Sequence, residues 1–170
     1  MNKIKLPVYP NKLLDDLKDD NFFKSVSIKI NEENNYIILE RESDDLIFDE
    51  RYNPSQNSSS FYKNHLKKTV SNIKNFLKEN GISKAKCVDV GCGKGEFVNL
   101  LNEDKYFNCV GFDTSYEGAS NKIKKRYLNK KDFDPEVDLV ILKYVLDYIN
   151  RPHEFLNKLK EIFPNSFIFI

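Results

Sequence analysis

The stretch VDVGCGKGEF, residues 88–97, constrains the fold most, because three glycines follow an apolar run and precede a sequence that can begin a helix. The glycines occupy alternate positions: Gly91, Gly93 and Gly95. A Walker phosphate-binding loop requires G-x-x-x-x-G-K-S/T, whereas Lys94 lies inside the glycine cluster. A dinucleotide-binding loop requires a third glycine at position 96, where Glu96 would repel a pyrophosphate. The remaining pattern is G-x-G-x-G, with an acidic residue, Asp89, two positions before it.

Helix-like and strand-like segments alternate from residue 61 onward. The first helical segment places apolar side chains on one face at steps of four, three and four: Leu66, Val70, Ile73 and Leu77. The expected helices are residues 61–80, 96–102, 116–125 and 152–163, and the expected strands are residues 86–90, 109–113, 126–128, 137–142 and 166–170. This alternation predicts an α/β fold with a doubly wound, mostly parallel sheet that helices cover on both faces.

Residues 1–57 are expected to form an appendage that precedes the main domain at residues 58–170. Residues 26–30 alternate apolar and polar side chains, and residues 36–39 form an apolar run after a stretch rich in Asn and Glu, which predicts a small β-hairpin. The turn-rich sequence NPSQNSSS, residues 53–60, marks the boundary, and its last serines can cap the following helix.

The composition excludes several classes of partner. With 27 Lys and Arg against 26 Asp and Glu, the formal net charge is +1, so no overall charge favours nucleic acid or an acidic membrane surface. No run approaches the roughly 18 apolar residues of a membrane-spanning helix. The three cysteines, Cys87, Cys92 and Cys109, form no C-x-x-C pair. We therefore expect a cytoplasmic protein with reduced thiols and no structural metal, which binds neither nucleic acid nor membrane.

A second acidic residue follows the next expected strand. In the sequence CVGFD, Asp113 lies 22 positions after Gly91, close to the roughly 20-residue spacing at which a carboxylate accepts hydrogen bonds from both ribose hydroxyls. The alternative role of Asp113 is to cap a helix that begins near Ser115.

With these two acids and the glycine loop, residues 61–170 resemble the class I S-adenosylmethionine-dependent methyltransferases. The resemblance implies a Rossmann-like methyltransferase sheet and S-adenosylmethionine as the cofactor. It implies that Asp89 helps to hold the amino-acid end of the cofactor, and that Asp113 and Thr114 lie at its ribose. The loop backbone would approach the cofactor because glycine has no Cβ, at Gly91, Cys92, Gly93 and Gly95. The alternative is a tight turn between a strand and a helix that binds no ligand.

Two later segments extend the resemblance. In NKKDFD, Asp132 stands where the family has an acidic residue, which implies a hydrogen bond from the adenine amine, and Phe133 would cover the ring face. A solvated loop residue is the alternative for Asp132. In DLVILKYVLDYI, residues 146–149 stand where the family has Leu-Glu-His-hydrophobic, with a tyrosine in place of the histidine. The resemblance also implies that Leu142 and Lys143 line the cofactor, chiefly through their backbone.

The sequence FDERYNPSQNSSSFYKNHL, residues 48–66, is similar to the lead-in of bacterial methyltransferases of sugars, nucleotide-sugars and surface polysaccharides. This similarity implies methyl transfer to a small molecule, with a sugar or nucleotide-sugar as the acceptor. Tyr52, Tyr62 and His65 either form part of an acceptor lid or attach the appendage to the domain. His65 is the candidate for a general base, whereas His153 lies in the first turn of an expected surface helix.

The resemblance implies a helix and an antiparallel strand pair after the fifth strand, whereas the sequence stops at SFIFI. The expected fold is therefore truncated after the fifth strand, with an apolar edge that favours association, for example as a homo-oligomer. The appendage, a second copy of the chain or the remainder of a longer protein would cover this edge. Two other functions stay open: a non-catalytic cofactor-binding or interaction protein, and a nicotinamide-dependent oxidoreductase, which Glu96 disfavours.

Overall fold

The computed structural model describes residues 3–7, 23–30, 37–41, 59–149 and 151–170. The chain divides into two compact units, Met1–Asn53 and Pro54–Ile170. Tyr52 and the turn-rich boundary up to residue 58 lie outside the described residues.

The first unit contains an antiparallel sheet in the order β1-β2-β3. Strand β2, Phe23–Ile30, pairs with β3, Ile37–Arg41, and Ile30 lies opposite Ile37. This pairing confirms the predicted hairpin. Strand β1, Lys3–Pro7, pairs with the other edge of β2 and was missed because five residues carry too short a pattern to distinguish a strand.

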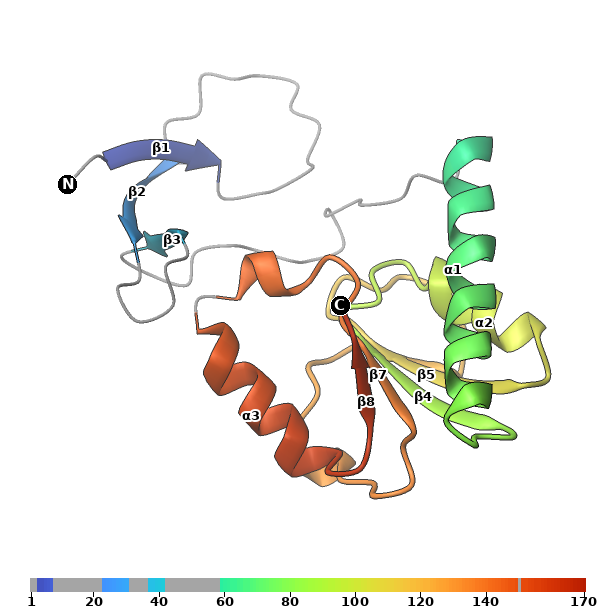
Figure 1. Cartoon of the computed structure of the whole chain (residues 1–170). Coiled ribbons are helices and arrows are strands. Elements are labelled where there is room, and N and C mark those ends of the chain that lie inside the picture. The colour runs from blue at the N-terminus through green and yellow to red at the C-terminus, as the bar shows by residue number, and fades with distance from the viewer. Residues whose placement is uncertain (1–2, 8–22, 31–36, 42–58, 150) are drawn as a thin grey trace. The chain divides into compact units, whose positions relative to one another are not determined.

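The second unit contains a five-stranded sheet in which every pairing is parallel, in the order β6-β5-β4-β7-β8 (Figure 1). Its strands are β4 (Ala85–Val90), β5 (Phe107–Phe112), β6 (Ile123–Lys124), β7 (Leu139–Ile141) and β8 (Phe167–Phe169). Asp89 of β4 lies between Gly111 of β5 and Ile141 of β7. The carboxyl ends of the three central strands therefore meet at one edge of the sheet, and the predicted parallel α/β fold is confirmed.

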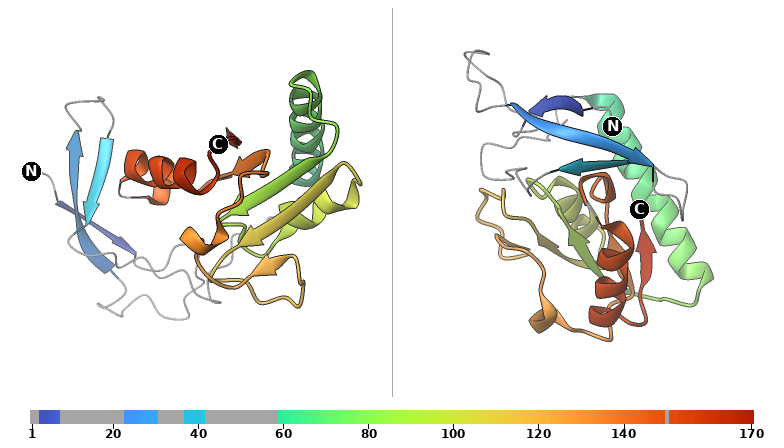
Figure 2. Two further views of the ribbon diagram at one scale, coloured as in Figure 1. Left: turned by 90° about the horizontal axis from the view of Figure 1, so that it is seen from below. Right: turned by 90° about the vertical axis from the view of Figure 1, so that its left-hand side faces the viewer.

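Helices cover both faces of this sheet (Figures 1 and 2). Helix α1, Ser60–Glu79, and helix α2, Glu96–Glu103, pack on one face, and α3, Pro152–Ile162, packs on the other. The buried residues of α1 are the four predicted from its periodicity, Leu66, Val70, Ile73 and Leu77. Ser59 caps α1 by accepting a hydrogen bond from the backbone of Tyr62 at 3.2 Å. No helix among the described residues is long and apolar enough to cross a membrane.

The predicted helix at residues 116–125 and the strand at 126–128 are wrong. The chain instead turns irregularly after β5 and forms the two-residue strand β6. The hydroxyl of Tyr116 accepts a hydrogen bond from the backbone of Ser120 at 2.9 Å, and a Cβ on Gly118 would overlap the Tyr116 ring. These contacts replace the backbone hydrogen bonds of a helix, so the apolar side chains in this segment fix a turn rather than a helical face.

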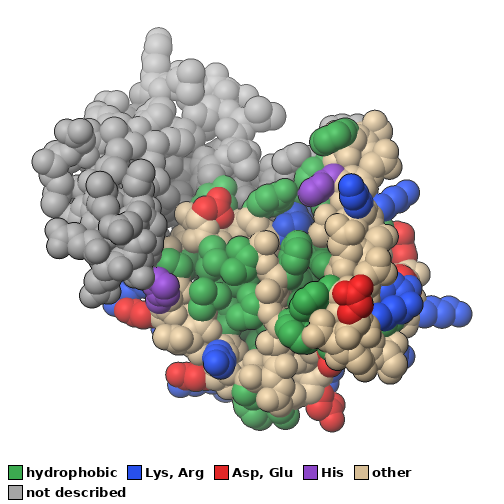
Figure 3. Space-filling view, viewed as in Figure 1, with side chains coloured by type: hydrophobic (Ala, Val, Ile, Leu, Met, Phe, Trp, Pro, Cys, Tyr) green, Lys and Arg blue, Asp and Glu red, His purple; other side chains and the backbone are tan. Residues whose placement is uncertain are grey.

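Strand β8 lies at one edge of the described sheet and borders an apolar groove beside α1. The groove is lined in part by Ile73 and Phe76 from α1 and by Phe167 and Ile168 from β8. The rings of Phe76 and Phe167 meet edge to face, with 5.0 Å between their centroids. Figure 3 shows hydrophobic side chains gathered around this strand.

Candidate cofactor site

The glycine loop connects β4 directly to α2, and two of its glycines are required by its shape. Gly91 has φ +75° and Gly95 has φ +82°, in the left-handed region that disfavours other residues. A Cβ on Gly91 would lie 2.6 Å from a methyl carbon of Val145, and a Cβ on Gly95 would overlap the Cδ1 of Ile123. The loop is therefore closely packed on both sides, and its backbone stands at the carboxyl edge of the sheet.

Asp113 is tied to the glycine loop by a hydrogen bond. The backbone N–H of Gly93 donates to its Oδ2 at 2.8 Å. The backbone N–H and hydroxyl of Ser115 donate to its Oδ1 at 2.7 and 2.6 Å. An ionised carboxylate has about four acceptor positions, so these three bonds leave capacity for a ligand hydroxyl. Asp113 caps no helix at Ser115, and Thr114, the next residue, is half-buried.

Asp89 lies at the end of the central strand, and its side chain is only 2% exposed. Burial disfavours the carboxylate and raises the pKa of Asp89 to about 7. The positive charge of Lys143 lowers this pKa, and the negative charge of Asp113 raises it further. The structure therefore places a buried acid with a raised pKa two residues before the first glycine of the loop.

Cys92 and Leu142 contribute to the frame of the site. The Sγ of Cys92 packs against Gly111, and burial raises the pKa of this thiol. The backbone N–H of Cys92 donates to the carbonyl of Phe112 at 3.3 Å, and its own carbonyl accepts from Gly95 at 3.0 Å. Leu142 is completely buried, and its N–H donates to the carbonyl of Phe169 at 2.8 Å. These backbone groups already stabilise the loop and the sheet.

The side chain of Lys143 makes a contact that sequence reasoning missed. Its Nζ donates a hydrogen bond to the hydroxyl of Tyr62 at 3.0 Å. The two residues are 81 positions apart, and Tyr62 lies in the first turn of α1. No local pattern relates them, because only the packing of α1 against the sheet brings them together. His65 lies one turn further along α1, exposed, with its ring centroid 6.2 Å from that of Tyr62.

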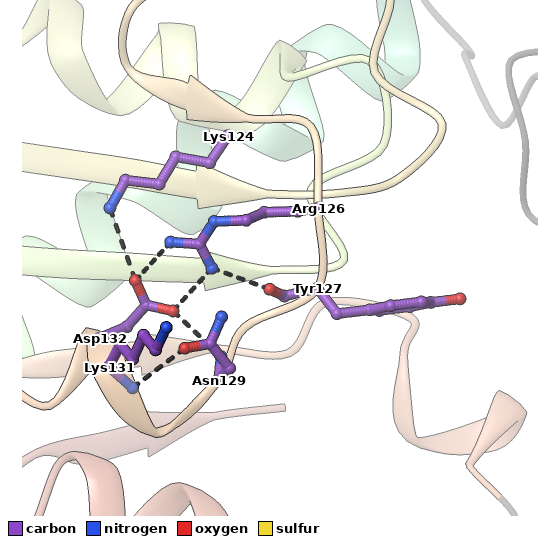
Figure 4. A network of polar contacts seen from close by, with 6 residues as sticks. All are labelled: Lys124, Arg126, Tyr127, Asn129, Lys131 and Asp132. Atoms are coloured by element: carbon purple, nitrogen blue, oxygen red, sulfur yellow. Dashed lines mark hydrogen bonds and ion pairs between the residues drawn. The ribbon is translucent and has the colours of Figure 1, made fainter.

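Asp132 belongs to a network of polar contacts beyond β6 (Figure 4). Its two carboxylate oxygens accept hydrogen bonds from Arg126 at 2.6 and 2.8 Å, and the backbone of Asn129 donates to it at 3.0 Å. Phe133 is exposed and, with Asp132, lines a cavity of about 260 Å³ whose other walls include Val110 and Phe112. The glycine loop does not line this cavity, so the adenine-binding role of the two residues stays a prediction.

Replacing Arg126 with methionine is expected to remove an acid-sensitive part of the stability. The hydrogen bonds from Arg126 hold the pKa of Asp132 at about 2, below its ordinary 3.8. A lowered carboxyl pKa stabilises the fold above about pH 4, and this contribution is lost as the pH falls toward 2. Because Arg126 is partly exposed, we expect the free energy of unfolding in urea to fall by about 1 kcal/mol at pH 7.

The matched control is Lys130→Met, which removes an exposed ion pair with Glu161. This variant is expected to leave the unfolding free energy unchanged within about 0.5 kcal/mol. If the unfolding free energies of Arg126→Met and the parent differ by the same amount from pH 7 to pH 3, the ion pair between Arg126 and Asp132 is not the source of the difference.

The comparison with known families agrees with this geometry. Residues 62–170 match the model of a family described as a methyltransferase domain. The chain belongs to this methyltransferase family. Its resemblance to the class I enzymes is thereby confirmed, and S-adenosylmethionine is its methyl donor. No curated protein matches the chain.

The residues of the methyltransferase's glycine loop fit this cofactor chemically. The cofactor carries an ammonium group and two ribose hydroxyls, all of which donate hydrogen bonds, and the loop has an acid on either side of it. Asp89 is the buried one, and Asp113 is the half-buried one with free acceptor capacity. A side chain at position 91 or 95 would collide with Val145 or Ile123, so only glycine keeps the loop backbone in this position at the edge of the sheet. Two acids at the loop therefore suit a ligand with a cationic end and would repel a polyphosphate.

Proposed function

We propose that this methyltransferase transfers a methyl group to a small molecule, and that the acceptor is a sugar or a nucleotide-sugar. The observation that carries the cofactor-binding part is the hydrogen bond from Gly93 to Asp113, which joins the two motifs into one site. The acceptor class rests on the similarity of residues 48–66 to the lead-in of sugar-modifying methyltransferases. The free thiols of Cys87, Cys92 and Cys109 support a reducing compartment, the cytoplasm, as the place of action.

In this proposal each candidate residue has one task. Asp89 accepts from the amino group of the cofactor, and Asp113 with Thr114 holds the ribose. Gly91, Cys92, Gly93 and Gly95 present their backbone to the ligand, Asp132 and Phe133 bind the adenine, and Leu142 and Lys143, just after β7, line the cofactor.

S-adenosylmethionine supplies an activated methyl group on a sulfonium, so the protein needs no covalent nucleophile. The contribution of the chain is to position the acceptor and to exclude water from the reacting atoms. His65 stands near Tyr62 at the same end of α1, where it can accept a proton from an acceptor hydroxyl.

Methyl-labelled S-adenosylmethionine added to the protein with a fractionated cell extract tests the acceptor class. We expect the label in the small-molecule fraction, within sugars or nucleotide-sugars that phosphatase or glycosidase treatment alters. His65→Gln is expected to reduce this transfer at least tenfold if the acceptor is a hydroxyl, without changing the affinity for S-adenosylhomocysteine. Label confined to protein or nucleic acid would contradict the proposal.

A further inference from the structure

Lys143 follows β7 by two residues, and its ammonium lies near the first turns of α1 and α2. In the sheet, Ile141 of β7 lies beside Asp89 of β4, so Lys143 follows that pair by two residues. Its Nζ donates to the Tyr62 hydroxyl at 3.0 Å. An ammonium has three hydrogens, and this bond uses one of them, so Lys143 keeps donors for a ligand.

Three aromatic rings surround the same ammonium. The Nζ lies 4.4 Å from the ring centroid of Tyr144, 5.6 Å from that of Tyr62 and 5.8 Å from that of Phe97. These distances favour a cation, because the ring faces are electron-rich. Two of the rings belong to helices, Tyr62 to α1 and Phe97 to α2, so the packing of these helices on the sheet fixes the position of the Lys143 ammonium.

The backbone of Tyr144, the residue after Lys143, adopts a strained left-handed conformation that the surrounding structure must maintain. Tyr144 has φ +58°, which among the non-glycine residues described here occurs nowhere else. A bulky side chain rarely adopts this conformation, and such strain is concentrated at functional sites. Tyr144 is also 60% exposed, so burial of its ring does not explain the strain. The conformation carries the chain from Lys143 to Val145, which packs against Gly91 of the glycine loop.

The charges of Asp89 and Lys143 are complementary to an amino acid in its zwitterionic form. Asp89 is buried two residues before the first glycine of the loop, and the positive charge of Lys143, just after β7, acts on it. The ammonium of Lys143 would repel the sulfonium of the cofactor if no anion lay near it. The carboxylate of the cofactor's amino-acid end, placed between this ammonium and the sulfonium, offsets that repulsion.

We propose that Lys143, held by Tyr62, binds the carboxylate of the cofactor's amino-acid end, while Asp89 binds its amino group. The inference rests on the cofactor site under the proposed function and adds to it the side-chain role of Lys143 and the participation of Tyr62. Lys143 is thus a binding residue that distinguishes an amino-acid-bearing nucleoside from one without the carboxylate.

Calorimetric titration of the full chain with two ligands tests this proposal. S-adenosylhomocysteine carries both the amine and the carboxylate, and its decarboxylated analogue carries only the amine. The parent is expected to bind the first at least tenfold more tightly. Lys143→Met is expected to raise the dissociation constant for S-adenosylhomocysteine about 20-fold and to leave that for the decarboxylated analogue unchanged within about twofold. Lys143→Arg, which keeps the charge, is expected to restore most of the discrimination.

Lys74→Met is the matched control. Like Lys143, Lys74 has its ammonium near a tyrosine ring, that of Tyr106 at 5.3 Å, but it also forms an ion pair with Asp104. It lies three turns further along α1, and its removal is expected to leave both affinities unchanged. Tyr62→Phe, which keeps the ring and removes the hydroxyl, is expected to raise the dissociation constant for S-adenosylhomocysteine about threefold.

Equal weakening of both ligands by Lys143→Met, or no weakening of either, would overturn the carboxylate-binding role of Lys143. If Lys143→Met weakens the binding of neither ligand, Lys143 does not bind the cofactor, and an anionic group of the acceptor becomes the alternative partner. Failure of the parent to bind S-adenosylhomocysteine would overturn the cofactor site itself, so the two failures are distinguishable.

Discussion

Asp113→Ala is expected to raise the dissociation constant for S-adenosylhomocysteine about 100-fold. The proposed role of Asp113 is to accept hydrogen bonds from the ribose, and hydrogen bonds to a charged group contribute about 1.5–3 kcal/mol each. The substitution also removes the acceptor for the backbone N–H of Gly93, which loosens the glycine loop. Isothermal titration calorimetry at pH 8 measures the effect.

Two variants separate ribose binding from loop order. Asp113→Asn keeps an oxygen that can accept from Gly93 and is expected to lose affinity by about tenfold. Asp104→Ala removes a carboxylate that pairs with Lys74 at the C-terminal end of α2, away from the glycine loop, and no change in affinity is expected. An Asp113→Ala protein that binds S-adenosylhomocysteine as tightly as the parent would refute the ribose-binding role.

Asp89→Asn is expected to make the protein more stable and, at the same time, a weaker cofactor binder. The pKa of Asp89 is raised to about 7 from an ordinary 3.8, so the folded state holds a proton that the unfolded chain releases between these pH values. The unfolding free energy of the parent therefore decreases as the pH rises from about 4 to about 7, and the full penalty remains above pH 7. At about 1.36 kcal/mol per pKa unit the ceiling of this penalty is about 4 kcal/mol.

An amide is also costly to bury, so we expect Asp89→Asn to gain about 2 kcal/mol at pH 8 and nothing at pH 4. Urea unfolding at the two pH values measures the gain. The affinity of the parent for S-adenosylhomocysteine is expected to rise from pH 6 to pH 8 as Asp89 ionises, and this rise is expected to disappear in the variant. Asp104→Asn, which removes a half-buried acid paired with Lys74, is expected to give no gain. Equal stability of Asp89→Asn and the parent at pH 8 would contradict the buried-acid interpretation.

The parts of the fold that local sequence patterns determine could be predicted. Helix α1 has a regular apolar face and a serine at its start, and both features act within a few residues. The unit of β4, the glycine loop and α2 follows from an apolar run, three glycines and a short amphipathic segment. Parallel strands place their carboxyl ends at the same edge, which is why the loop and Asp113 could be assigned to one site, but the hydrogen bond between them was not predicted.

The parts that failed depend on contacts between distant residues or on competing local bonds. The segment after β5 has helix-like spacing, but the bond from Ser120 to the Tyr116 hydroxyl and the space at Gly118 favour a turn. The partner of Asp132 is Arg126, six residues earlier, and the two meet across the short 3₁₀ helix that Asn129 caps. Lys143 was assigned a backbone role since its partner Tyr62 belongs to a helix far away in the sequence.

A crystal structure of the full chain with S-adenosylhomocysteine tests the central claim most directly. The account predicts ligand density against the backbone of residues 91–95, with the ribose hydroxyls within hydrogen-bond distance of the Asp113 carboxylate and the amino-acid end between Asp89 and Lys143. Ligand density elsewhere, such as in the apolar groove beside β8 or wholly within the cavity at Phe112, with the glycine loop uncontacted, would contradict it.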